Sequence, residues 1–224
     1  MKDEKETRKK LLESAKKEFK EKGYHHASLR NICKNAGVTT GALYFFFKDK
    51  EDLFTSLVKK PLEEIEQIIG KHYKEEQNQA FEGDILEKDV TSDFEVSYEL
   101  LDIIYQQRDE FILLLTEAEG TSAQKKLDQI IDKTERHYCV LSEMVAKKLQ
   151  QPRIDEVVLH WMAHHILDIF IYMVTHIEDK EEARRYLEQV IRYTIGGWFA
   201  MFQTSYTWEK QEKNDNENSY QRKL

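Results

Sequence analysis

The sequence predicts an all-α fold of about nine helices. Its 224 residues include only two prolines and eight glycines, and 34% of the residues are charged. This composition favours helices over sheets. Apolar residues recur at helical spacing in most segments, and no segment has the alternating pattern of a strand. A chain of this length can bury a substantial core in one or two domains.

Residues 28–50 predict two short helices joined by a tight turn. Ser28 is a favourable N-cap for the first helix, and Gly37 stands where this helix must end, because glycine enters the left-handed conformation without steric cost. Thr39 is expected to cap the second helix, which runs to about Phe46. Such a pair is a helix-turn-helix, in which the second helix enters the major groove of DNA.

The segment Ala36–Phe54 (A-G-V-T-T-G-A-L-Y-F-F-F-K-D-K-E-D-L-F) closely resembles the helix-turn-helix of the TetR family of transcriptional regulators. The resemblance covers about residues 7–60 and implies a DNA-binding domain there. The rest of the chain is similar to that family only in length and helical character.

The candidate DNA-binding residues fall into two groups. Those expected to contact phosphates offer hydroxyls or cations: Ser28, Thr40, Tyr44, Lys48 and Lys50. Those expected near bases lie at the two helix starts or on the second helix: Arg30, Thr39, Gly41, Ala42 and Phe45. Small residues at the start of the second helix would let its backbone approach the base edges closely. Leu43, Phe46 and Phe47 are expected to face inward.

The charge distribution supports a DNA-binding N-terminal part. The whole chain has a net charge of -8, but residues 1–60 hold 15 Lys/Arg against 9 Asp/Glu, a local +6. The remaining residues hold 19 against 33, a local -14. Affinity for nucleic acid depends on the local field and on phosphate contacts, so this distribution suits a basic DNA-binding domain on an acidic body. Charges that merely alternate for solubility are the alternative.

The pattern predicts two further helices in the N-terminal part, residues 7–22 ended by Gly23 and a helix capped by Asp49 with Asp52 as the capping-box acid. Pro61 predicts a kink or break around residues 59–60. We expect the domain boundary there. The predicted domains are a DNA-binding domain at 1–60, an effector-binding and dimerisation domain at 61–205, and a polar, disordered tail at 206–224.

The body is expected to begin with a continuation of the fourth helix and a loop at residues 80–91. The helices that follow are expected at residues 92–107 (capped by Ser92 with Glu95), 109–119, 122–149, 155–177 and 180–204, the last capped by Asp179.

The last two long helices carry more apolar residues than packing against one neighbouring helix pair requires. The adjacent glycines 196 and 197 each cost about 1 kcal/mol in a helix relative to alanine, which close helix approach would offset. The resemblance to the TetR family implies that these helices form a homodimer interface; the alternative is packing within one chain. The predicted interface residues are Trp161, Ile169, Gly196, Gly197, Trp198 and Met201.

The resemblance also implies a small-molecule effector pocket in the body, and pockets combine apolar walls with a few polar groups. The candidate pocket residues are Tyr98, Asp102, Tyr105, Tyr138, Trp161 and His165. Asp102 and Glu117 lie on otherwise apolar helices. An unpaired buried carboxylate would favour an apolar or cationic effector over an anion.

No metal or cofactor is predicted. His160, His164 and His165 share parts of a helix face, but no nearby Cys, Asp or Glu completes a familiar zinc-binding spacing. His137 and Asp168 could still approach them in space. Cys33 and Cys139 show no disulfide or metal pattern. A glycine-rich phosphate loop, a nucleophile elbow and an HExxH motif are all missing, so an enzyme is not expected.

These observations predict a homodimeric transcriptional regulator, a repressor released from a palindromic operator by a small-molecule effector. The alternative is a helical ligand-binding or protein-interaction module without operator binding. Partners are double-stranded DNA, the effector and a second copy of the chain. Without a signal peptide or a run of about 18 apolar residues, we expect a cytoplasmic protein with no membrane partner.

Overall fold

A computed structural model describes residues 2–82 and 91–202, in which the chain folds into nine helices and no strand. The prediction of an all-α protein with about nine helices is confirmed. The helices are α1 (Lys2–His26), α2 (Leu29–Ala36), α3 (Thr40–Phe46), α4 (Lys50–Glu82), α5 (Thr91–Gln106), α6 (Arg108–Thr116), α7 (Ser122–Leu149), α8 (Glu156–His176) and α9 (Lys180–Ala200).

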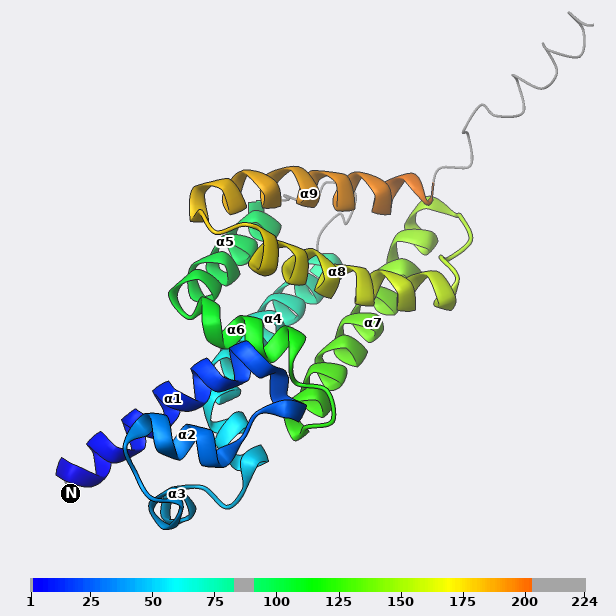
Figure 1. The fold of residues 1–224 in the computed structure, drawn as a ribbon. Coiled ribbons are helices and arrows are strands. Elements are labelled where there is room, and N and C mark those ends of the chain that lie inside the picture. The colour runs from blue at the N-terminus through cyan, green and yellow to red at the C-terminus, as the bar shows by residue number, and fades with distance from the viewer. Residues whose placement is uncertain (1, 83–90, 203–224) are drawn as a thin grey trace, which may run out of the picture.

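The helices form two packed groups joined by α4 (Figure 1). The small bundle of α1, α2 and α3 lies at one end and α5, α8 and α9 lie at the other, while α7 runs from beside the bundle to the far end of the body. Helix α6 packs against both α1 and α4, so it lies between the two groups. One apolar core runs through both, from Phe19 and Phe54 at the N-terminal end to Phe111 and Met173 in the body. The two groups therefore share a continuous interior.

Helix α4 passes through Pro61 without interruption from Lys50 to Glu82. Of the kink or break predicted around residues 59–60, the break is therefore wrong. Proline removes one intrahelical hydrogen bond, but Val58, Leu62 and Ile65 on either side are buried, and packing against α5, α6 and α7 holds the helix together. Most of the predicted loop at residues 80–91, and the predicted tail at 206–224, lie outside the described residues.

Most helix starts follow the predicted caps. The Asp49 carboxylate accepts from the N–H of Asp52 at 2.9 Å, and Asp179 accepts from the N–H of Glu182 at 2.8 Å. Helix α7 begins at Ser122 as predicted, with Thr121 as its cap, whereas α1 begins at Lys2 rather than at residue 7. Helices α5 and α6 each start one residue earlier than predicted, since α5 already includes Thr91 and α6 begins at Arg108. Neighbouring hydroxyl and carboxyl residues compete for the same cap position, which explains such shifts.

Helix α8 is unusually apolar for its position. An 18-residue window within it has a mean hydropathy of 1.5, yet only 33% of that window is buried in the single chain. By length and composition alone, α8 could cross a membrane, although no run of about 18 apolar residues was identified in the sequence. Apolar core helices of soluble proteins have the same length and composition.

Candidate nucleic-acid interface

The turn between α2 and α3 has the predicted geometry. Ser28 caps α2 by accepting from the N–H of Asn31 at 3.4 Å. Gly37 adopts φ 67° and ψ 33°, and its N–H donates back to carbonyls of the last turn of α2. The N–H of Val38 donates to the carbonyl of Cys33 at 3.0 Å. A left-handed residue with these two bonds ends the helix sharply, so α3 leaves at a defined angle.

Helix α3 presents one face to the solvent and one to the core. Thr39 caps it, accepting from the N–H of Ala42 at 3.2 Å. Leu43 and Phe47 are fully buried, whereas Tyr44 is 55% exposed and Phe45 is 71% exposed. Phe45, a candidate for contact with bases, lies on the outer face. Phe46, predicted to face inward, is only partly buried and packs edge-on against Phe45 at 4.9 Å.

A buried carboxylate holds α2 against α1. Glu18 accepts from the backbone N–H of Ser28 at 3.1 Å and from the side chain of Asn31 at 3.3 Å. One turn earlier on α1, the hydroxyl of Ser14 donates to the carbonyl of Ile32 at 2.9 Å. The sequence analysis missed both contacts, because Glu18 resembles any surface acid of a charged helix. They keep the start of α2 rigid next to the turn.

Two lysines predicted to contact phosphates have different surroundings. Lys48 is exposed. The ammonium of Lys50 instead donates to the carbonyls of His25 (3.0 Å) and Ala27 (3.4 Å) and lies 4.8 Å from the centre of the Tyr24 ring. A cation at these carbonyls neutralises the negative end of α1. A phosphate contact by Lys50 would compete with these bonds, which leaves Lys48 as the freer cation.

The remaining candidates, Arg30, Thr40 and Gly41, are exposed, and Ala42 is partly exposed. A methyl group placed on Gly41 would meet only the hydroxyl of Thr39, at 3.8 Å. The fold of this chain therefore does not require glycine at position 41.

Helix α6 and the start of α7 contact the N-terminal bundle through polar groups. Lys16 pairs with Glu110 at 2.9 Å and Lys20 with Asp109 at 2.5 Å. The N–H of Tyr24 donates to Glu117 at 3.3 Å. Although burial by itself lowers the pKa of Lys16, the hydrogen bond and charge of Glu110 raise it above its ordinary value. These contacts connect the bundle to the body independently of α4.

Gly23 makes the contact with Glu117 possible. Its backbone has φ 73° and ψ 164°, and a Cβ at this position would lie 2.7 Å from the Glu117 carboxylate oxygen. Any side chain here would be strained and would also displace Glu117. Helical geometry is interrupted at Gly23, as predicted, but helical hydrogen bonding resumes and carries α1 to His26.

The candidate dimer residues divide in the structure. Trp161 and Met201 are exposed, as are Gly196 and Gly197, where an added Cβ would meet nothing within 4 Å. Ile169, in contrast, is only 7% exposed and belongs to the main core of the single chain, so it offers little surface to a partner. On a helix with apolar residues on every side, spacing alone could not tell the inward face from the outward one.

Trp198 is partly buried against residues of its own chain. Its ring centroid lies 5.7 Å from that of Tyr138 and 5.6 Å from that of Phe202. Other large apolar side chains are strongly exposed along α8 and α9. They are Val157 (81%), Tyr172 (51%) and Tyr193 (69%). The two helices therefore offer a broad apolar face in the single chain, as an interface would.

The candidate pocket residues do not converge on one place. The hydroxyl of Tyr98 donates to Glu188 of α9 at 2.8 Å, and burial together with Glu188 raises the pKa of Tyr98. The hydroxyl of Tyr105 donates to the carbonyl of Ile177 at 2.7 Å. Tyr138 packs against Trp198, at the other end of α9. These tyrosines join helices to one another.

The two carboxylates proposed to attract a cation are both paired. Asp102 is 57% exposed and forms an ion pair with Lys180 at 2.8 Å. Glu117 accepts from the N–H of Tyr24. The prediction that Asp102 lines the interior is therefore wrong, since the solvent-facing side of α5 could not be identified without its neighbours. The argument for a cationic effector loses its basis.

The predicted histidine group is open to solvent. His160 lies 2.8 Å from a Glu135 oxygen and is 58% exposed, and its ring neighbours that of His164. The His165 ring stacks on the exposed Trp161, a candidate pocket residue that lies on the outer face of α8. His137 lies elsewhere, in a separate polar cluster with Glu76.

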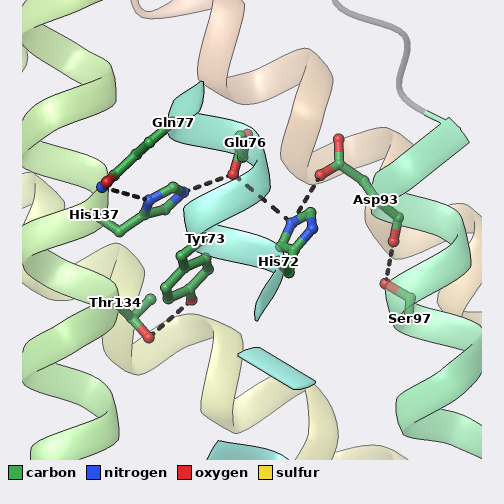
Figure 2. A network of polar contacts seen from close by, with 8 residues as sticks. All are labelled: His72, Tyr73, Glu76, Gln77, Asp93, Ser97, Thr134 and His137. Carbon is green, nitrogen blue, oxygen red and sulfur yellow. Dashed lines mark hydrogen bonds and ion pairs between the residues drawn. The ribbon is translucent and has the colours of Figure 1, made fainter. Parts of the chain in front are cut away.

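That separate cluster lies inside the body, between α4, α5 and α7 (Figure 2). His72 lies 3.3 Å from an oxygen of Asp93 and 3.7 Å from one of Glu76, and His137 lies 2.6 Å from the same Glu76 oxygen. Sequence reasoning missed it. The only local signal is His72 with Glu76, four residues apart on one helix face; the other members come from distant helices.

The geometry at residues 28–48 defines a class of protein: a helix-turn-helix DNA-binding protein with a helical body. Residues 11–57 match the family described as bacterial regulatory proteins, tetR family. The chain is 30% identical over 196 residues to the HTH-type transcriptional regulator AcrR of Shigella flexneri, covering 81% of this chain and 86% of that one. The chain belongs to the TetR family, whose members are transcriptional regulators rather than enzymes.

Solved structures show the same fold. NalD, the secondary repressor of the MexAB-OprM multidrug efflux pump in Pseudomonas aeruginosa, superposes with a TM-score of 0.52 at 21% identity, over 86% of this chain and 97% of that one. The regulator FadR from Bacillus subtilis, crystallised with stearoyl-CoA, superposes with a TM-score of 0.50 at 18% identity, over 81% of this chain and 96% of that one.

Proposed function

We propose that this chain is a homodimeric repressor that binds a palindromic operator and leaves it when a small molecule occupies the body. The observation that carries the proposal is the outward face of α3. This helix is rigidly capped at Thr39, begins with small exposed residues, and continues into an exposed Tyr44 and Lys48. That is the form of a helix that enters a major groove.

The DNA contacts divide by chemistry. The hydroxyls of Ser28, Thr40 and Tyr44 and the ammonium of Lys48 are assigned to phosphates, which supply affinity without sequence preference. Residues near the bases are the exposed or partly exposed side chains around the helix starts: Arg30, Thr39, Gly41, Ala42 and Phe45. Gly41 is assigned to close approach, because the protein itself has room for a side chain there.

The dimer is proposed to form through α8 and α9. Their exposed aromatic and aliphatic side chains would be covered in a two-fold symmetric contact, and Gly196 and Gly197 would let the partner helix approach closely. Two recognition helices related by such an axis would reach major grooves about 34–36 Å apart or a multiple of that distance. The operator would therefore be a palindrome.

The effector is proposed to be a small molecule with a large apolar part. The paired state of Asp102 removes the case for a cation, and FadR, which has the same fold, was crystallised with an acyl-CoA. Occupation of the body would be transmitted by α4 and by α6, which holds Lys16 and Lys20 through Glu110 and Asp109. Because the protein acts on DNA, we assign it to the interior of the cell.

The test is fluorescence anisotropy with duplexes from the region upstream of the protein's own coding sequence. We expect saturable binding of one dimer per palindrome, lost in the double variant Tyr44→Ala/Lys48→Ala, which removes two exposed side chains and leaves the core unchanged. Titration with long-chain acyl-CoA should then release the duplex. If the wild type and the double variant bound every duplex equally, the result would support the alternative, a helical module without operator binding.

A further inference from the structure

We propose that His72, Glu76 and Asp93 form a binding site for one divalent transition-metal ion in the body of this protein. His72 and Glu76 come from α4, one helical turn apart, and Asp93 comes from the first turn of α5. One possible ligand atom from each of the three residues lies within 4.8 Å of the other two. The proposal does not depend on DNA binding or on the small-molecule effector.

The distances suit a metal ion. The Nε2 atom of His72 lies 3.3 Å from Oδ1 of Asp93 and 3.7 Å from Oε2 of Glu76. Ligand atoms about 2.0–2.1 Å from a tetrahedral zinc ion are about 3.3–3.4 Å apart, so an ion fits between them after small side-chain adjustments. All three side chains converge from two helices on one point (Figure 2).

The surroundings orient the ligands. His137 lies on α7, and its Nε2 is 2.6 Å from Oε2 of Glu76. The amide nitrogen of Gln77 lies 3.3 Å from Nδ1 of His137 and can donate to it, which leaves Nε2 as the nitrogen that donates to Glu76. Histidine and carboxylate ligands in metal sites are typically held by such outer hydrogen bonds.

The His137 ring is itself held in place. Tyr73 stacks on it with ring centroids 4.0 Å apart and planes 8° apart. The Tyr73 hydroxyl donates to Thr134, 2.9 Å away, and Thr134 donates to the carbonyl of Ile130. The ring stacking and hydrogen bonds that hold His137 therefore connect α4 with α7.

The site is sheltered from water. The side chains of His72, Glu76 and Asp93 are only 14%, 10% and 17% exposed. Exposed acidic pairs are common on charged helices, but a histidine and two carboxylates are rarely brought together in the interior without a function. One imidazole with two carboxylates suits Zn²⁺ or Mn²⁺ better than the soft thiolate-binding metals.

The experiment is calorimetric titration of the full-length protein, treated with chelator and dialysed, with ZnCl2 and separately with MnCl2. We expect one ion per chain. Asp93→Asn, which keeps the size of the side chain, should weaken binding at least about tenfold, as should His72→Gln; His137→Gln should weaken it about 10–100-fold through the outer hydrogen bond.

Two control variants address other sources of binding. Asp102→Asn alters an exposed carboxylate on the same helix as Asp93, and His160→Gln alters the exposed histidine group on α8. Both should bind the ion as the wild type does. Loss of binding in His160→Gln, or unchanged binding in Asp93→Asn and His72→Gln, would overturn the proposal, as would a wild type that shows no saturable binding up to about 1 mM ion.

Thermal unfolding provides a second measurement, which uses the wild-type protein and therefore does not depend on whether the variants fold. At an ion concentration about 100-fold above the dissociation constant, the wild-type unfolding midpoint should rise by about 5 °C or more, because the ion binds only the native arrangement of α4 and α5. No shift for either ion would contradict the site. Circular dichroism of each variant at 20 °C checks that a loss of affinity reflects a lost ligand.

Discussion

The N-terminal bundle and the body differ in the range of the contacts that shape them. The hydrogen bonds that end α2 and begin both α2 and α3 join residues three to five positions apart, such as Ser28 with Asn31 and Val38 with Cys33. In the body they join residues far apart in the chain, such as Tyr73 with Thr134 and Tyr98 with Glu188.

This difference decides what each part can do. Locally determined turns present the same surface whatever happens elsewhere, which suits a part that must recognise DNA. A body held by long-range contacts between helices can change when a ligand alters those contacts. Helices α4 and α6 belong to both parts, and Lys16, Lys20 and Tyr24 are the residues through which the bundle would sense such a change.

The largest effect is expected from Gly197→Leu. A leucine at the proposed close contact would overpack it, and because a two-fold interface contains the residue twice, the cost is about 2–6 kcal/mol per dimer. Analytical ultracentrifugation should show monomers, and operator binding should fall with the dimer. The matched control is Gly70→Leu on α4, where an added Cβ also meets nothing within 4 Å. Dissociation in both variants would argue against an interface at α9.

A second effect separates recognition from stability. Gly41→Ala should weaken operator binding about tenfold or more by blocking close approach, while the free energy of unfolding stays the same or rises by up to about 1 kcal/mol. Gly37→Ala should do the reverse and cost about 1–2 kcal/mol of stability, because position 37 has φ 67°. Chemical denaturation and anisotropy measure the two quantities. Unchanged affinity in Gly41→Ala would remove this residue from the interface.

The two lysines after α3 test where the DNA surface ends. Lys48→Ala should weaken binding to every duplex and reduce the slope of log affinity against log salt by about one unit. Lys50→Ala should instead lower the free energy of unfolding by about 0.5–1.5 kcal/mol, since its ammonium holds the carbonyls of His25 and Ala27. A reduced salt slope in Lys50→Ala would restore the phosphate contact predicted from the sequence.

The smallest effect concerns the contact between the bundle and α6. A double-mutant cycle with Lys16→Met and Glu110→Gln should give a coupling of about 0.5–1 kcal/mol, whereas Lys10 and Glu6, an exposed pair on α1, should give almost none. The pKa of Lys16 is raised in the folded protein. The coupling should therefore be complete below its ordinary pKa of 10.5 and fall as the pH rises through the folded value. A coupling that persists when Lys16 is neutral would rule out a charge effect.

By itself, the sequence determined the helices, most of their caps and the helix-turn-helix. Each of these depends on nearby residues: Ser28, Gly37, Thr39 and Asp179 act within four positions of themselves. The exposure of Tyr44 and the burial of Leu43 also follow from helical spacing around a short, clearly amphipathic helix. The match to the family description likewise covers residues 11–57, where these local signals are densest.

The tertiary structure alone decided which side of each body helix faces inward. Asp102 was placed on the wrong side, because on helices that are apolar on most faces the neighbours determine the orientation. It also decided that Pro61 does not interrupt α4, since packing outweighs one lost hydrogen bond. The cluster of His72, Glu76, Asp93 and His137 depends on the meeting of α4, α5 and α7, which brings together residues that lie far apart in the sequence.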